Sequence, residues 1–153
     1  MKKFLKIIIS LSLIIYLYVL AILLFFNRTG WTEMTLIDYI MFSSNIVPFK
    51  TISMYIQAIF HGNMNLDIPI KNLFGNLFMF LPMGLYLPYF IKRTKQVSVF
   101  SIVFLSILFL IEFSQLLIRR GSFDIDDFIL NTIGALIGFT IWKKLFKRNA
   151  MRG

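Results

Sequence analysis

The sequence predicts an all-α integral membrane protein, with about four transmembrane helices and an interfacial or re-entrant segment between the first and the second. Of the 153 residues, 58% are hydrophobic and only 15% are charged, and the mean hydropathy is +0.79. Soluble domains contain roughly 45–50% apolar and about 25% charged residues. The apolar residues also occur in blocks of about 20, the length that an α-helix needs to cross a bilayer. Both the composition and the block lengths therefore favour a membrane protein.

Four apolar blocks define the expected spans, at about residues 4–26, 72–91, 97–118 and 128–146. They leave no room for a soluble domain, so we expect residues 1–153 to form a single membrane domain. The first block starts like a signal peptide, but it is too long and no small-residue cleavage site follows, which predicts an uncleaved helix. Pro82 cannot donate a hydrogen bond to the carbonyl of Phe78, which predicts a kink in the second span near Phe78.

The long connection at residues 27–71 contains no full span. Residues 35–42 and 52–60 have helical length but are too short to cross, so we expect interfacial or re-entrant segments there. Between them we predict a turn at residues 45–49, because Pro48 disfavours helical geometry at Val47.

The formal net charge of +9 comes from basic residues at the ends of the apolar blocks. Charges that set the topology of membrane proteins lie at such positions. This distribution gives no reason to expect a nucleic-acid partner. If each block crosses once, eleven basic residues lie on one side and five on the other. The richer side is expected to be cytoplasmic. The prediction is a multi-pass protein of the cell membrane with both termini in the cytoplasm. The five outer residues are Arg28, Lys50, Lys71, Arg119 and Arg120.

A polar stripe begins inside the third span. Glu112, Gln115 and Arg119 follow the spacing i, i+3, i+7, which places them on one helical face. A charge at the centre of a membrane helix costs about 2.5–3.5 kcal/mol on insertion scales, so such groups usually have a function. We therefore favour a site for an anion or a proton. The alternative is an internal ion pair, in which Arg119 neutralises Glu112 and extends to the surface.

The same spacing recurs at the start of the fourth span, in Asp124, Asp127 and Asn131. Asp127 or Asp124 is expected to cap free N–H groups there and to complement the helix dipole. A divalent cation bound by these two carboxylates stays open as an alternative. The loop lacks the EF-hand pattern, however, and we expect neither a metal nor a cofactor. For Asp126 we favour a role in capping and a solvated turn.

Asparagines and glycines complete the set of candidate residues. Asn72 and Asn76 share one face of the second span, and their outward depth allows a joint polar pocket with Glu112 and Asn131. Gly134 and Gly138 form a GxxxG pair, which in membrane helices usually serves helix packing.

Few enzyme classes remain possible. The chain has no cysteine and a single histidine, His61, which we expect at the surface. No motif of a serine hydrolase, zinc protease, P-loop or dinucleotide-binding enzyme is present. Whether the protein is an enzyme stays open, with Glu112 or Asp127 as the candidate general acid or base.

The ordered set of polar motifs resembles the VanZ-like family. The residues are Asn45-x-x-Pro48-Phe49, Asn72-x-x-x-Asn76 followed by residues 80–84 (FLPMG), Glu112-x-x-Gln115, Arg119, Asp124, Asp127, and Asn131-Thr132-x-Gly134-Ala135-x-x-Gly138. The resemblance implies a small bacterial membrane protein. The named member of that family is associated with reduced susceptibility to teicoplanin-type glycopeptide antibiotics. No catalytic residue comes with the resemblance.

Two functions are consistent with these residues. In the first, an outward-facing polar pocket binds or modifies an amphiphilic envelope molecule, such as a lipid-linked cell-wall precursor, and lowers susceptibility to lipoglycopeptides of the teicoplanin type. In the second, the chain is a structural subunit that packs through Gly134 and Gly138 against another membrane protein and has no ligand of its own. The lipid bilayer is the expected environment in both cases.

Overall fold

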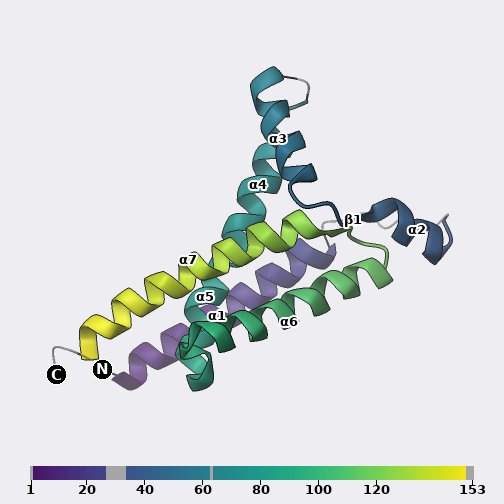
Figure 1. Cartoon of the computed structure of the whole chain (residues 1–153). Coiled ribbons are helices and arrows are strands. Elements are labelled where there is room, and N and C mark those ends of the chain that lie inside the picture. The colour runs from purple at the N-terminus through teal and green to yellow at the C-terminus, as the bar shows by residue number, and fades with distance from the viewer. Residues whose placement is uncertain (1, 27–33, 63, 151–153) are drawn as a thin grey trace.

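The computed structural model describes residues 2–26, 34–62 and 64–150, and it is almost entirely helical (Figure 1). Its elements are α1 (Lys2–Ala21), the π-helical segment η1 (Ile22–Phe26), α2 (Leu36–Ser43), β1 (Ser44–Asn45), α3 (Lys50–His61), α4 (Asp67–Met79), α5 (Leu81–Phe90), the 3₁₀ turn η2 (Lys92–Lys95), α6 (Val97–Leu117), β2 (Phe123–Asp124) and α7 (Ile125–Ala150).

Four helical segments are long and apolar enough to cross a membrane, which confirms the predicted fold class. They are Lys3–Phe26, Asp67–Phe90, Val97–Leu117 and Ile125–Leu145. The second begins five residues before the expected start at residue 72. Asp67 complements the dipole at the first turn of the helix, and Pro69 is tolerated there because that turn needs no N–H donor. Hydropathy marks where the apolar block starts, whereas the helix starts earlier, in polar sequence.

The second span is interrupted at Phe80, between α4 and α5. Pro82 follows two residues later, and the Phe80 carbonyl accepts hydrogen bonds from the N–H groups of Met83 and Gly84, at 3.1 and 3.4 Å. The interruption therefore lies two residues after the kink predicted from Pro82. It divides the span into two helices, and α7 contacts both of them, crossing α4 at a steep angle (Figure 1).

Aromatic side chains form the core between α5, α6 and α7. Phe80, Phe100 and Phe104 are fully buried. The rings of Phe100 and Phe139 lie 4.7 Å apart, and Phe80 meets Phe104 edge-on at 5.7 Å. Such pairs add about 0.5–1.5 kcal/mol each to the burial of their area.

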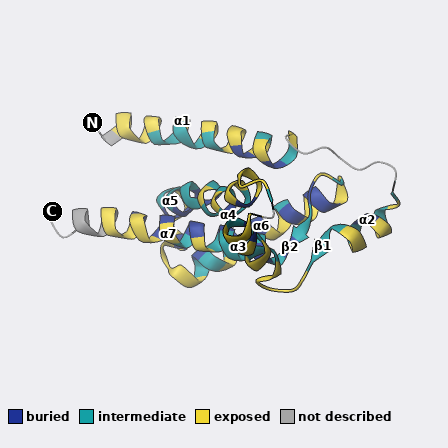
Figure 2. Cartoon of the chain, turned by 90° about the horizontal axis from the view of Figure 1, so that it is seen from above, coloured by how far each residue is buried: buried dark blue, intermediate teal, exposed yellow. Residues whose placement is uncertain are grey.

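The first span lies on the outside of this core, with most of its surface exposed (Figure 2). Hydrogen bonds attach it along its length: Tyr16 donates to the carbonyl of Met79 and Tyr86 donates to Ser12, both at 3.0 Å, and Gln115 donates to the carbonyl of Leu24 near its end. Its exposed leucine and isoleucine side chains are suited to lipid.

The connection between the first and second spans contains two short helices, α2 and α3, close to the predicted segments. α3 and α4 form a hairpin that projects from the bundle (Figure 1). Before α3, Ser44 and Asn45 pair in parallel with Phe123 and Asp124. The sequence did not predict this two-residue ladder, which ties the connection to the turn before α7.

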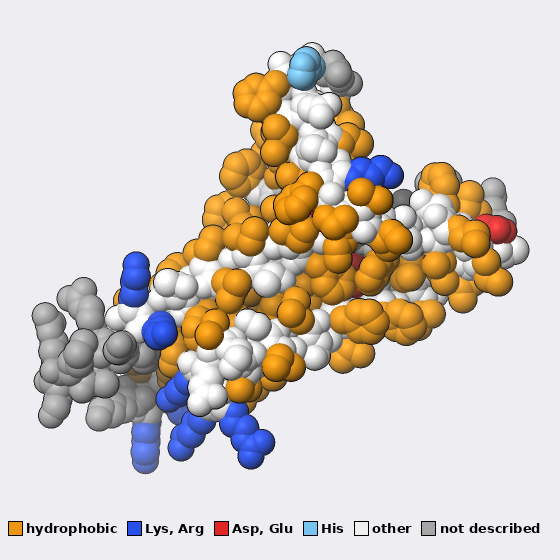
Figure 3. Space-filling model, viewed as in Figure 1, with side chains coloured by type: hydrophobic (Ala, Val, Ile, Leu, Met, Phe, Trp, Pro, Cys, Tyr) orange, Lys and Arg blue, Asp and Glu red, His pale blue; other side chains and the backbone are white. Residues whose placement is uncertain are grey.

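Both ends of the described chain lie at one end of the bundle (Figure 1), where Lys and Arg side chains gather (Figure 3). Lys95 of the α5–α6 turn stands 5.9 Å from the ring of Trp142 in α7, so this turn belongs to the same end. The turn between α6 and α7 and the start of α3 lie at the opposite end. The assignment of the basic end to the cytoplasm stays a prediction.

Candidate functional site

Asp126 holds the start of α3 against the start of α7. Its carboxylate is completely buried and accepts three backbone N–H groups, from Phe49 at 2.5 Å, Thr51 at 2.7 Å and Ile52 at 3.0 Å. α3 has no capping side chain of its own, and Phe49 before it has a left-handed backbone with φ of 63°. The carboxylate thus caps a helix from a distant part of the chain. Asp126 therefore caps α3 and not the fourth span in which it lies, and the turn around it is not solvated.

Asp124, two residues before Asp126, also binds side chains near the start of α3. One of its carboxylate oxygens accepts the amide of Asn45 at 3.0 Å and the N–H of Asp126 at 2.9 Å, and the other accepts the hydroxyl of Thr51 at 2.6 Å. The bond to the N–H of Asp126 caps the first turn of α7, one of the roles predicted for Asp124. We call Asn45, Thr51, Asp124 and Asp126 the clasp. Every clasp carboxylate oxygen has a partner within the protein.

A second cluster lies between α4 and α7. The amide of Asn76, a buried side chain, donates to the carboxylate of Asp127. One turn further along α7, Asn131 is 2% exposed, and its carbonyl oxygen Oδ1 has no hydrogen-bond partner among the described residues. The hydroxyl of the adjacent Thr132 is likewise buried without a partner there. We call Asn76, Asp127 and Asn131 the amide cluster.

The close contacts of two glycines show that the face of α7 with Asp127 and Asn131 packs against the second span. A Cβ atom on Gly134 would come within 1.9 Å of the carbonyl oxygen of Leu77, and one on Gly138 within 2.0 Å of that of Leu81. Since Asp127, Asn131, Gly134 and Gly138 are spaced at i, i+4, i+7 and i+11, they form one stripe along α7. Asn131 therefore lies between two positions that touch α4, and its amide belongs to the α4–α7 contact.

The same contacts correct the structural alternative drawn from the sequence. Gly134 and Gly138 are buried against the chain's own second span, at the carbonyls beside its interruption. Another membrane protein cannot reach them. The expectation that these two glycines pack against a partner is therefore wrong, because the close approach they permit is used within the chain.

The polar residues of α6 lie against the end of the first span. Gln115 is 1% exposed and donates to the carbonyl of Leu24 at 2.6 Å, in the π-helical segment. Glu112, one turn earlier, is 4% exposed. Arg119 lies beyond the end of α6 with φ of 55°, and it donates to the carbonyl of Met34 at 2.7 Å. Because α6 ends at Leu117, the predicted stripe does not continue to Arg119. The ion pair of Glu112 with Arg119 stays a prediction.

A family model, VanZ/LLP1, matches residues 13–147. The chain belongs to the VanZ/LLP1 family. The matched range includes the clasp, the amide cluster and the polar residues of α6. No curated protein and no solved structure gives a match.

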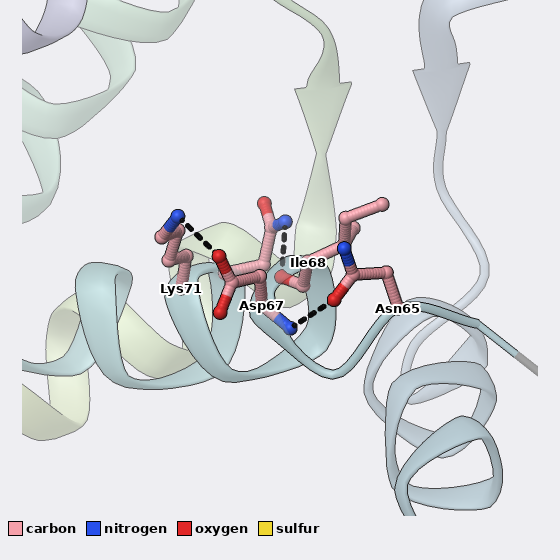
Figure 4. Close-up of polar contacts among 5 residues, drawn as sticks. Asn65, Asp67, Ile68 and Lys71 are labelled. Carbon is pink, nitrogen blue, oxygen red and sulfur yellow. Dashed lines mark hydrogen bonds and ion pairs between the residues drawn. The ribbon is translucent and has the colours of Figure 1, made fainter. Parts of the chain in front are cut away.

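In this VanZ/LLP1 chain, the predicted site residues fall into three neighbouring groups at the end of the bundle away from the termini. Asn76, Asp127 and Asn131 form the amide cluster. Asp124 belongs to the clasp, and Glu112 and Gln115 lie on α6. Asn72 joins none of these through a hydrogen bond that the described residues show, because its amide donates to the carbonyl of Ile68 on its own helix at 2.9 Å. It lies in the first half of α4, next in sequence to Lys71, whose ammonium group pairs with the carboxylate of Asp67 at 2.9 Å (Figure 4).

Two residues that make contacts in this region were not predicted from the sequence. Thr51 was not among the predicted site residues, although its side chain can form hydrogen bonds and it lies three residues after Pro48, at the start of an amphipathic segment. Tyr39 of α2 is buried, and its hydroxyl donates to the carbonyl of Gly121 at 2.5 Å, which joins α2 to the α6–α7 turn. Both contacts cross more than seventy residues, so no local pattern marks them.

Among the described residues, no group of three His, Cys, Asp or Glu side chains could hold a metal ion. The acidic residues of the α6–α7 turn are close in sequence, but Asp124 and Asp126 direct their oxygens to protein donors. The chemistry of this region is therefore that of a hydrogen-bonding site.

Proposed function

We propose that this protein binds an amphiphilic envelope molecule at the amide cluster and thereby lowers susceptibility to teicoplanin-type antibiotics. The observation that carries the proposal is the buried Oδ1 atom of Asn131, which has no hydrogen-bond partner among the described residues. Leaving a buried acceptor unpaired costs about 1–3 kcal/mol. A ligand that donates a hydrogen bond to it removes that cost.

The chemistry of the cluster indicates which ligand it suits. Asn131 and Asp127 both present acceptor oxygens, and the Thr132 hydroxyl next to them can donate or accept. Hydroxyl and amide N–H groups are the matching donors, and the head group of a lipid-linked cell-wall precursor carries both kinds. The exposed hydrophobic surface around the bundle suits the lipid part of such a molecule. Arg119, at the same end of the bundle, is the cation that would engage its anionic group.

Susceptibility to teicoplanin in cells that make the protein tests this function. Asn131→Leu and Asp127→Asn should each abolish the protection that the wild-type protein gives. Asn72→Leu is the matched control, because it removes an asparagine from the neighbouring helix whose amide, among the described residues, donates within α4 to the carbonyl of Ile68. Equal protection by all four proteins, at equal amounts in the membrane, would exclude the amide cluster as the site.

Turnover separates a binder from an enzyme. If Glu112 or Asp127 acts as a general acid or base, lipid extracts from cells with the protein will contain a species that is absent from cells without it. If the protein only binds its ligand, the extracts will be identical while protection differs. The binding function is the one we propose.

A further inference from the structure

A second amphiphilic site lies on α3, outside the clasp and the amide cluster. It is a groove of about 340 Å³ lined by Lys50, Ser53, Met54, Gln57, Ala58 and Met64. The lining contains one cation, two neutral polar side chains and three apolar ones, and no acidic residue. Such a lining suits a ligand with a negative charge next to an apolar part.

The charge of Lys50 is available to a ligand. Lys50 is exposed and has no ion pair among the described residues. Asp126, which caps the same helix, is fully buried and already accepts three N–H groups. The other basic residue of the hairpin, Lys71, is paired with Asp67 at 2.9 Å (Figure 4).

The two faces of α3 place this groove at the membrane surface. Lys50, Ser53, Gln57 and His61 follow one polar stripe, at i, i+3, i+7 and i+11. The opposite face carries the isoleucines of the helix, of which Ile56 is 44% exposed, and Phe60, at the border between the two faces, is 81% exposed. An amphipathic helix of this kind lies in the interface, with its apolar side in the acyl chains and its polar side among the head groups.

We infer that the α3 groove binds the anionic head group of a membrane lipid. The phosphate is held by the ammonium group of Lys50, the Gln57 amide donates to its ester or glycerol oxygens, and Met54 and Met64 contact the apolar part. The clasp holds the groove in place, since it fixes the first turn of α3. This site is separate from the amide cluster and goes beyond the proposed function, on which it rests only for the membrane leaflet that supplies the lipid.

Native mass spectrometry of the full chain in an uncharged detergent tests the site. Dioleoyl phosphatidylglycerol is the probe, and dioleoyl phosphatidylcholine is the neutral comparison. Lys50→Ala should weaken phosphatidylglycerol binding about fivefold, as expected for one basic side chain at an anionic head group. Lys71→Ala is the matched control, because it removes the same charge from the same hairpin outside the groove, and it should change binding less than about twofold.

Three results would overturn the inference: equal losses in the two lysine variants, no loss in Lys50→Ala, or full displacement of the lipid by an equal concentration of inorganic phosphate. The first would indicate general attraction to the hairpin, and the last a site for phosphate alone. Asn131→Leu should bind phosphatidylglycerol as the wild type does. If that variant also retains teicoplanin protection, the proposed function fails while the α3 site stands.

Discussion

At the scale of single residues, Asp126 determines where α3 begins and where it is anchored. Three backbone donors from residues 49–52 converge on one buried carboxylate. Hydrogen bonds to a charged acceptor are stronger than neutral ones, and each donor left unpaired in a buried place is costly.

Asp126→Ala should therefore lower the free energy of unfolding by about 2–3 kcal/mol. Equilibrium unfolding of the purified protein in mixed micelles measures this loss. Asp67→Ala is the control, because Asp67 is also an acidic first-turn residue, but its side chain is 70% exposed and its ion pair is worth little. Similar losses in the two variants would contradict the role of Asp126 as the anchor of α3.

Replacing Asn131, unlike replacing Asp126, should not lower the free energy of unfolding. Asn131→Leu replaces a side chain with an unpartnered buried oxygen by an apolar one of similar size, so we expect its free energy of unfolding to equal or exceed that of the wild type. The same micelle unfolding experiment measures it. A clear destabilisation by this variant would show that the amide has a structural partner and would weaken the case for a ligand there.

At the scale of elements, the contact of α7 with the interrupted second span depends on the absence of side chains at Gly134 and Gly138. The interruption at Phe80 divides the span, and α7 approaches both halves closely: a Cβ added at Gly134 would meet the backbone of Leu77 in α4, and one at Gly138 the backbone of Leu81 and Gly84 in α5. A Cα–H beside a carbonyl oxygen also adds a weak hydrogen bond.

Gly134→Ala should destabilise the protein by at least about 1–3 kcal/mol, the cost of inserting a methyl group into a packed contact. Thermal unfolding in detergent should show a lower midpoint. Gly75→Ala is the control on α4, because a Cβ there has nothing within 4 Å. It should be neutral or stabilising by up to about 1 kcal/mol through helix propensity. Equal tolerance at both glycines would show that α7 can move away from the second span at little cost.

At the scale of the whole molecule, orientation in the membrane decides which compartment each site faces. The bundle separates a basic end, with both termini, from an opposite end that carries the clasp, and the α3–α4 hairpin projects from its side (Figure 1, Figure 3). The positive-inside rule assigns the basic end to the cytoplasm.

Cysteine labelling tests this assignment without background, because the chain has no cysteine. His61→Cys should react with a membrane-impermeant thiol reagent in intact cells, and Gln96→Cys should react only after lysis. Both positions are exposed, whereas Thr94 in the same α5–α6 turn is 1% exposed and would stay unlabelled in either orientation. Labelling of Gln96→Cys alone in intact cells would invert the topology, and the envelope-facing function would fail with it.

The sequence by itself determined the class of the protein and the approximate place of its helices. Apolar blocks of about 20 residues specify spans because the bilayer requires that length, and Pro82 indicated the interruption because proline lacks the N–H that a helix needs. The short helices of the long connection also followed from their length. Polar spacing singled out Asp124, Asp127, Asn76, Asn131 and Gln115 as candidate site residues.

Only the tertiary structure decided what each of these groups meets. Asp126 reaches a helix more than seventy residues away, Gln115 reaches the π-helical end of the first span, and the glycines of α7 are used inside the chain. Helical periodicity tells which side chains share a face, but it carries no information on which other helix covers that face. In a membrane, where lipid and protein are equally apolar, polar contacts and close backbone approach make that choice. Those contacts lie between residues that are distant in sequence, so they appear only once the chain is folded.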